Sequence, residues 1–142
     1  MQLLKNAGRE RVLDKLESWL RSGSTIDIMS PEFSLHAFAE TRRLLNNADA
    51  VRMLLGERTK LAHSLFGGLA DIGHRNKLQG RWHAKSALDW LGKNVQVRYG
   101  GALPQSMALV QNVSLKRAVI GTCPFTTEGL GITPGSQLGL VQ

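Results

Sequence analysis

Residues 106–132, SMALVQNVSLKRAVIGTCPFTTEGLGI, contain two short apolar runs joined by a polar link and followed by a glycine-rich stretch. The runs at 106–111 and 117–122 have the length and composition of strands, so the segment predicts two strands around a short turn. Gly121, the small hydroxyl residue after it, and a threonine opening a short glycine-terminated helix are typical of a strand that delivers backbone N–H donors to an anion. Pro124 stands where a polar amide is expected. The stretch therefore predicts an anion-binding turn, or only its outline.

The rest of the chain predicts strands and helices in alternation. Apolar residues at spacings near three and four predict one amphipathic helix over residues 1–21. Ser30 is the expected N-cap of a helix over 31–45, because Pro31 suits the first helical position. Residues 57–91 have a mostly helical pattern that glycines interrupt. Further strands are expected at 25–29, 50–56, 94–100 and 136–142.

These elements predict the α/β class, with a mixed β-sheet flanked by helices. The chain has 142 residues, 42% of them hydrophobic, which suffices for one domain with a core and leaves no room for a second. We therefore expect a single domain over 1–142. The last residues, LGLVQ, are apolar without a closing turn. Either the final strand lies at a sheet edge, or the chain is a fragment of, or accessory to, a larger protein.

The charge of the chain favours a polyanionic partner. It carries 18 Lys and Arg against 11 Asp and Glu, a formal net charge of +7, and its pI is about 10.2. Nucleic acid is the first such partner, and a protein that is merely basic is the alternative. A lone cysteine, Cys123, cannot form an internal disulfide, so a reducing, cytoplasmic location is expected. No apolar run approaches the ~18 residues of a membrane span, and the start of the chain is charged throughout, so no membrane association is expected.

No metal or other cofactor is expected. Histidines at 36, 63, 74 and 83 are too scattered for a recognised ligand spacing. The segment GERTK that begins at Gly56 lacks the glycine pattern of a P-loop. Cys123 has no adjacent His or Lys, so we interpret it as a buried, inert thiol.

Five segments in this order resemble the phospholipase D-like superfamily, over about residues 10–142. They are IDIMSPEFSLHAFAETRRLL, AVRMLLG, NVQVRYG, LPQSMALVQN and RAVIGTCPFTTEGLGITPGSQLGLV. The likeness is greatest to the small domains of bacterial nucleases and to those at the ends of helicases. The resemblance implies a phospholipase D-like fold, nucleic acid as the partner class and a homodimer, because each motif of this family is half a site.

The family's site is His-x-Lys, an Asp five positions after the Lys, and a Gly-Ser-x-Asn turn on the next strand. The His attacks phosphorus, while the Lys, Ser and Asn stabilise the phosphate oxygens. Gly121 matches this pattern, Thr122 matches it in part, and the gap before Gly121 is slightly longer than usual. The vestigial positions, in the order of the family's His, Lys, Asp, Ser and Asn, are Gln105, Met107, Asn112, Thr122 and Pro124. None of these side chains supplies a phosphorus nucleophile or a positive charge, so the resemblance implies a catalytically inactive member.

A second tripeptide, His83-Ala84-Lys85, matches His-x-Lys outside this register. The apolar residues around it have helical spacing, and no Gly-Ser turn follows at a suitable distance. On a helix, side chains two positions apart point in different directions. We therefore interpret this tripeptide as helical and not catalytic.

Basic residues interleaved with aromatic ones lie between Gly73 and Lys85, where no acidic residue occurs. This pattern suits phosphate contacts combined with base or sugar stacking. The alternative is a solvated helix face with Trp82 packed inward. Arg42 and Arg43 lie near an expected helix C-terminus, where the helix dipole favours cations, so they need no ligand to explain them. The candidate nucleic-acid-binding residues are Arg75, Lys77, Arg81 and Lys85, with Lys116 and Arg117 near the vestigial site.

Three functions remain open at this stage. The first is an inactive phospholipase D-like domain that binds nucleic acid, DNA rather than RNA, as a homodimer or within a helicase or nuclease complex. The second is a protein-interaction or dimerisation module that uses the apolar groove left by the replaced site residues. The third is residual phosphodiesterase or nuclease activity.

Overall fold

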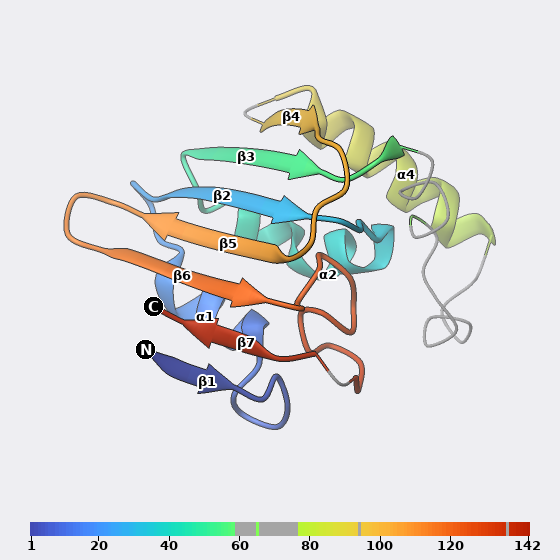
Figure 1. Cartoon of the computed structure of the whole chain (residues 1–142). Helices are drawn as coiled ribbons and strands as arrows, with labels where there is room; N and C mark the ends of the chain where they lie inside the picture. The colour runs from blue at the N-terminus through green and yellow to red at the C-terminus, as the bar shows by residue number, and fades with distance from the viewer. Residues whose placement is uncertain (59–64, 66–76, 94, 136) are drawn as a thin grey trace.

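A seven-stranded mixed β-sheet organises the chain, in the strand order β1-β7-β6-β5-β2-β3-β4 (Figure 1). The computed structural model describes residues 1–58, 65, 77–93, 95–135 and 137–142, with the side chains of α4 described from residue 81 on. The elements are β1 (Gln2–Leu4), α1 (Val12–Trp19), β2 (Thr25–Ser30), α2 (Leu35–Leu45), β3 (Ala50–Leu55), α4 (Lys77–Leu91), β4 (Val95–Tyr99), β5 (Ser106–Gln111), β6 (Lys116–Gly121) and β7 (Gly139–Val141). This architecture confirms the predicted α/β class with a mixed sheet.

Parallel and antiparallel pairing meet at the central strand β2. It pairs in parallel with β3 and antiparallel with β5, and β3 pairs in parallel with β4. The remaining neighbours, β5–β6, β6–β7 and β7–β1, are antiparallel. Helices connect the parallel strands, because a parallel pair needs a long crossover, whereas a short turn suffices between β5 and β6.

The hydrophobic core lies between one face of the sheet and the three described helices, which Figure 1 shows on the same side of the sheet. Alternate strand residues point into it, such as Ile26 and Ile28 of β2. Helix α2 contributes Phe38, whose ring centroid lies 4.9 Å from that of Trp90 on α4. The opposite face of the sheet is covered by none of the described helices.

The prediction of a single helix over residues 1–21 is wrong for the first residues. Residues 2–4 form β1, which pairs with β7, and helix α1 begins at Val12. The break occurs at Asn6, which has a left-handed backbone (φ 54°) and is buried. Its side-chain amide donates to the carbonyls of Glu128 and Gly129, and its Oδ1 accepts from Val12 N. A long-range pairing therefore replaces the locally favoured helix.

The predicted N-cap of the second helix is also wrong. Ser34 caps α2, and its Oγ accepts from the N–H groups of His36 and Ala37. Ser30 is the last residue of β2, where its Oγ accepts from Phe125 N at 2.8 Å. By residue type, either serine could cap a helix. Because β2 extends through Ser30, the helix begins only after Ser34.

Two expectations about the C-terminal part need correction. The helix expected after Gly121 is a series of hydrogen-bonded turns at 126–131. The final strand covers 139–141 and lies between β6 and β1, so it is not an edge strand. Of the helical region expected at 57–91, the described part at 77–91 is the helix α4, and 59–64 and 66–76 lie outside the described residues.

Candidate functional site

Three vestigial positions meet in one hollow at the end of the sheet, where β5 begins and β6 ends. Gln105, Thr122 and Pro124 line it together with residues that follow β2, and its volume is about 410 Å³. Gly121 is required at this point, because a Cβ there would lie 2.3 Å from the carbonyl oxygen of Leu138. We call this hollow the strand-end pocket.

The backbone donors of this turn are already used inside the chain. Thr122 N donates to Leu138 O at 3.0 Å, and Cys123 N donates to Ser106 Oγ at 2.8 Å. Phe125 N donates to Ser30 Oγ, and Pro124 has no N–H group to offer. The anion-binding interpretation of this stretch is therefore wrong for the backbone, and only its outline is present.

The charge of the strand-end pocket is negative. Glu32 and Glu128 line it, and among its described lining residues there is no Lys, Arg or His. The amide of Gln137 donates to Glu128 Oε2 at 3.2 Å. A pocket with carboxylates and without cations disfavours a phosphate, since like charges repel at short range.

The other two vestigial positions do not reach the strand-end pocket. Met107 lies on the uncovered face of the sheet, directly opposite Met29 and Ile120 on the neighbouring strands. Asn112 lies beyond the other end of β5, where its Oδ1 accepts from the N–H groups of Ser114 and Leu115 and closes the β5–β6 turn. Asn112 is thus a turn residue with a structural partner.

The strongest basic candidates lie on the outer face of α4. Arg81 and Lys85 are both exposed and are four positions apart, which places them on one side of the helix. Trp82 between them is 60% exposed, so the alternative that packs it inward is wrong. The inward-facing tryptophan of this helix is Trp90, which is 7% exposed. We call Arg81, Trp82 and Lys85 the α4 basic face.

The remaining predicted basic residues are distributed differently. Lys77 begins α4, but its side chain and the whole of Arg75 lie outside the described residues. Lys116 and Arg117 are exposed at the start of β6, next to the β5–β6 turn. Figure 1 shows that turn at the left end of the strands, whereas α4 lies at the right of the picture. The structure therefore does not join the β6 pair to the α4 basic face.

A basic residue of α2 lies next to α4, although its place in the sequence predicts only a position near a helix C-terminus. The guanidinium of Arg42 donates to Ser86 Oγ at 2.6 Å, and Arg43 beside it is exposed. This contact extends positive charge from α4 to α2. A contact between two helices leaves no signal in the local sequence pattern.

The tripeptide His83-Ala84-Lys85 lies on α4, which confirms that it is helical. The His83 ring lies 6.1 Å from the His36 ring of α2 between centroids, whereas Lys85 is exposed on the outer side. His83 Nδ1 is buried without a hydrogen-bond partner. Burial, reinforced by His36, lowers the pKa of His83 below its ordinary value, and Glu40 opposes this shift. The two side chains therefore do not converge on one phosphate.

Cys123 is half-buried beneath the turn. Burial raises the pKa of its thiol to about 11. The thiolate is the reactive form, so the raised pKa agrees with the interpretation of Cys123 as an inert thiol, although the side chain is half-buried and not fully buried. Among the described residues, no group of three or more His, Cys, Asp or Glu side chains could hold a metal ion.

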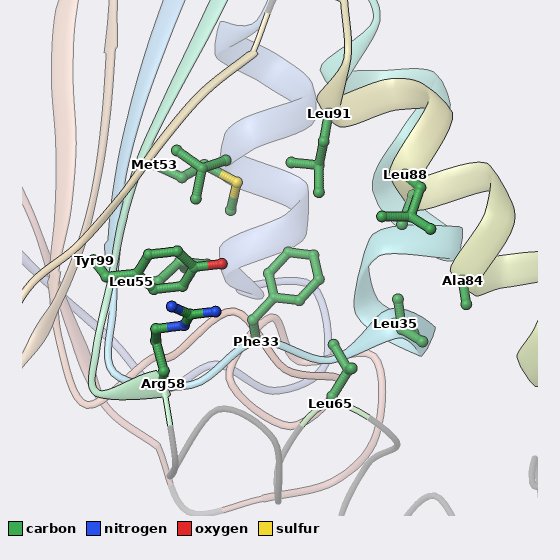
Figure 2. Close-up of a pocket in the computed structure, with 12 residues that line it drawn as sticks. Phe33, Leu35, Met53, Leu55, Arg58, Leu65, Ala84, Leu88, Leu91 and Tyr99 are labelled. Atoms are coloured by element: carbon green, nitrogen blue, oxygen red, sulfur yellow. The ribbon is translucent and has the colours of Figure 1, made fainter.

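An apolar cavity of about 380 Å³ lies between the sheet and α4 (Figure 2). Its walls come from β3, β4, α4 and the start of α2, and the guanidinium of Arg58 lies over the Tyr99 ring, 5.4 Å from its centroid. The other lining residues are Phe33, Leu35, Met53, Leu55, Leu65, Ala84, Ala87, Leu88, Leu91 and Val97. Walls of this kind suit an apolar group, and Arg58 is the only charged side chain among the described lining residues.

A comparison of the chain with models of protein families finds no match, and neither does a comparison with curated proteins. The seven-stranded mixed sheet and its helices place the protein in the mixed α/β class. No helix in the described parts of the chain is both long and apolar enough to cross a membrane.

Proposed function

We propose that this chain is a catalytically inactive phospholipase D-like domain that binds nucleic acid, DNA rather than RNA, through the α4 basic face. The observation that carries the proposal is the exposed ring of Trp82 in the same stretch of α4 as the exposed cations Arg81 and Lys85. Leaving a large aromatic surface in water is unfavourable. An exposed indole flanked by cations suits stacking on a base while the cations contact phosphates.

The strand-end pocket supports the inactive assignment. Gln105 replaces the expected nucleophile, Pro124 replaces the expected amide, and two carboxylates face the space where the phosphate would lie. The backbone N–H groups of the turn are engaged within the chain. Cations stabilise a phosphoryl transition state, and the described lining contains no Lys, Arg or His.

Salt dependence tests the electrostatic part of the proposal. Binding of a fluorescein-labelled single-stranded oligonucleotide and its duplex is measured by anisotropy at increasing salt. We expect a steep linear fall of log affinity with log salt, because each neutralised phosphate releases counterions. A flat salt response, or no binding at low salt, would contradict nucleic-acid binding.

Substitution of the α4 basic face tests its location. Arg81→Gln with Lys85→Gln should lower the magnitude of the salt slope by about two. Trp82→Ala should weaken single-strand binding by about tenfold with the slope retained, since stacking is not ionic. Lys5→Gln with Arg9→Gln removes the same charge from exposed positions near the N-terminus and serves as the control. An equal loss in the control would show that only net charge matters.

A protein-interaction module is the second candidate function. The observation that favours it is Met107, which lies half-buried on the uncovered face of the sheet among other apolar side chains. Charge reversal at Arg75, Lys77 and Arg81 separates the two functions, because it should abolish nucleic-acid binding and leave the docking of a helicase or nuclease subunit intact.

Residual hydrolysis is tested directly with a labelled duplex and a generic phosphodiester substrate. We expect the wild type, Gln105→Ala and His83→Ala to be equally inactive. Turnover that disappears only in His83→Ala would assign catalysis to α4 and overturn the inactive assignment.

A further inference from the structure

An apolar row crosses six strands of the sheet on its uncovered face. The cross-strand registers place the members directly opposite one another from β1 to β3: Leu3, Leu140, Ile120, Met107, Met29 and Leu54. Opposite residues of neighbouring strands point to the same face. The residues that alternate with them, such as Leu4, Ile28 and Val119, are buried on the helix side. The row ends at Arg98 on β4.

The apolar row is open to solvent along its length. Leu3, Leu140 and Leu54 are 55%, 42% and 37% exposed, and the three members between Leu140 and Leu54 are half-buried. None of the described helices covers this face (Figure 1). A contiguous apolar patch of this kind marks an interaction surface.

We propose that two copies of this chain pair face to face through the apolar row. A two-fold axis parallel to the strands, between β5 and β6, superposes the row of one copy on the row of the other. Ile120 then faces the partner's Met107, Leu140 faces the partner's Met29, and Leu3 faces the partner's Leu54. Apolar meets apolar at every position, so the surface is its own complement, as a two-fold interface requires.

The neighbouring row is compatible with this pairing. It runs through Ala118, Leu109, Asp27 and Arg52. The same axis places Ala118 over the partner's Leu109, so the centre remains apolar. Arg52 donates two hydrogen bonds to the Asp27 carboxylate, with Nη2 to Oδ2 at 2.6 Å. The axis places no side chain of like charge from the partner opposite Asp27 or Arg52. The ion pair therefore lies toward one side of the interface, where its charges are balanced.

The size of the overlapping face suits a weak, reversible dimer. The axis pairs six strands and leaves β4 outside the overlap, and the three-residue strands β1 and β7 limit the overlap with the partner's β3 and β2 to about 10 Å, against about 20 Å at β5 and β6. The resulting projected area is about 400 Å², before the relief of side chains is added, against the ~800 Å² that each partner buries in a standard interface. Two sheets packed this way form the centre of a sandwich with their backbones about 10 Å apart.

This pairing is independent of the proposed function. The dimer implied by the family resemblance would join two copies around a shared catalytic site, whereas the apolar row lies on the broad face of the sheet. The nucleic-acid proposal concerns α4, on the other side of the sheet (Figure 1). Arg81→Gln with Lys85→Gln should therefore leave self-association unchanged, so each proposal can fail without the other.

Sedimentation velocity from about 1 µM to about 100 µM tests the pairing. We expect the wild type to dimerise within this range and Met107→Lys to weaken the dimer at least about 100-fold, because each copy would bury an unpaired ammonium near the axis. Asn47→Lys, at an exposed position just after α2 and so on the helix side of the sheet, is the matched control and should change the dissociation constant less than about threefold. A monomeric wild type, or a folded Met107→Lys that dimerises as well as the wild type, would overturn the proposal.

Chemical cross-linking tests the orientation. Met29 and Leu140 lie three strand spacings apart within one copy, about 14 Å, but the axis brings Met29 over the partner's Leu140. A thiol cross-linker of about 8 Å applied to Met29→Cys with Leu140→Cys, in a Cys123→Ser background, should give a covalent dimer. Asn47→Cys, on the helix side of the sheet, should give none in the same background. A dimer without selective cross-linking would overturn this pairing and show that the copies meet through another surface.

Discussion

At the scale of single residues, one buried polar side chain joins the two ends of the chain. Asn6 is 6% exposed, and its amide and its oxygen make three hydrogen bonds to residues 12, 128 and 129. All three partners are backbone groups, which would be left without a partner if the side chain were removed. Such groups are costly to bury unpaired, so Asn6 stabilises the N-terminal turn against the 126–131 turns.

We therefore expect Asn6→Ala to lower the free energy of unfolding by about 2–4 kcal/mol. The loss arises from the unpaired carbonyls and N–H group and is measured by urea denaturation. Asn47→Ala, at an exposed position after α2, should change it by less than about 0.5 kcal/mol. Equal small effects in both variants would show that Asn6 is dispensable.

His83 makes stability depend on pH. Burial lowers its pKa in the folded state, so the unfolded chain takes up a proton more readily, and stability is lost as pH falls through the folded pKa. We expect the melting temperature to fall between pH 7.5 and pH 5.5 and the fall to be smaller in His83→Leu. A replacement of Glu40 by Gln should steepen the fall, because that carboxylate favours the protonated ring. Identical pH profiles in the wild type and His83→Leu would contradict this assignment.

At the scale of elements, α4 has two faces with opposite roles. Trp90 packs on Phe38 of α2 and lies in the core, whereas Trp82 is exposed beside Arg81 and Lys85. The hydrophobic pattern predicted a helix here but left the orientation of Trp82 open. Packing of α4 against α2 and the sheet decides it, since only one side of a helix can be buried against a single layer.

The two tryptophans should respond differently to truncation. Trp90→Ala should lower the free energy of unfolding by about 3–5 kcal/mol, because it leaves a cavity against Phe38. Trp82→Ala should change it by less than about 0.5 kcal/mol while weakening nucleic-acid binding. Chemical denaturation of both variants provides the measurement. A large stability loss in Trp82→Ala would assign that ring to packing and remove the main support for nucleic-acid binding.

At the scale of the whole molecule, the protein is a half-covered sheet with helices on one face and an apolar row on the other. Figure 1 shows all three described helices on the same side. Covered by a second copy, the sheet would form the centre of a four-layer assembly with the two α4 basic faces on its outer surfaces. Each copy could then contact nucleic acid without competing with the dimer contact.

Self-association should stabilise the fold by mass action. We expect the melting temperature of the wild type to rise between about 1 µM and about 100 µM protein, because the dimer binds only the folded state. Met107→Lys should melt at a temperature independent of concentration. A wild type whose melting temperature stays constant across this range would contradict a folded dimer.

The sequence by itself determined the features that local pattern controls. It predicted the α/β class and placed the strand at 106–111 with its observed bounds, because period-two and helical patterns are written within a few residues. The resemblance to the phospholipase D-like superfamily also implies that Gln105 and Met107 stand in place of its nucleophile and its cation, and neither side chain can supply those groups in any fold. Tertiary structure alone decided which of Ser30 and Ser34 caps α2, and it engaged the donors of the turn after Gly121 with distant partners. It also aligned the apolar row, because the register between strands depends on contacts between residues far apart in the chain.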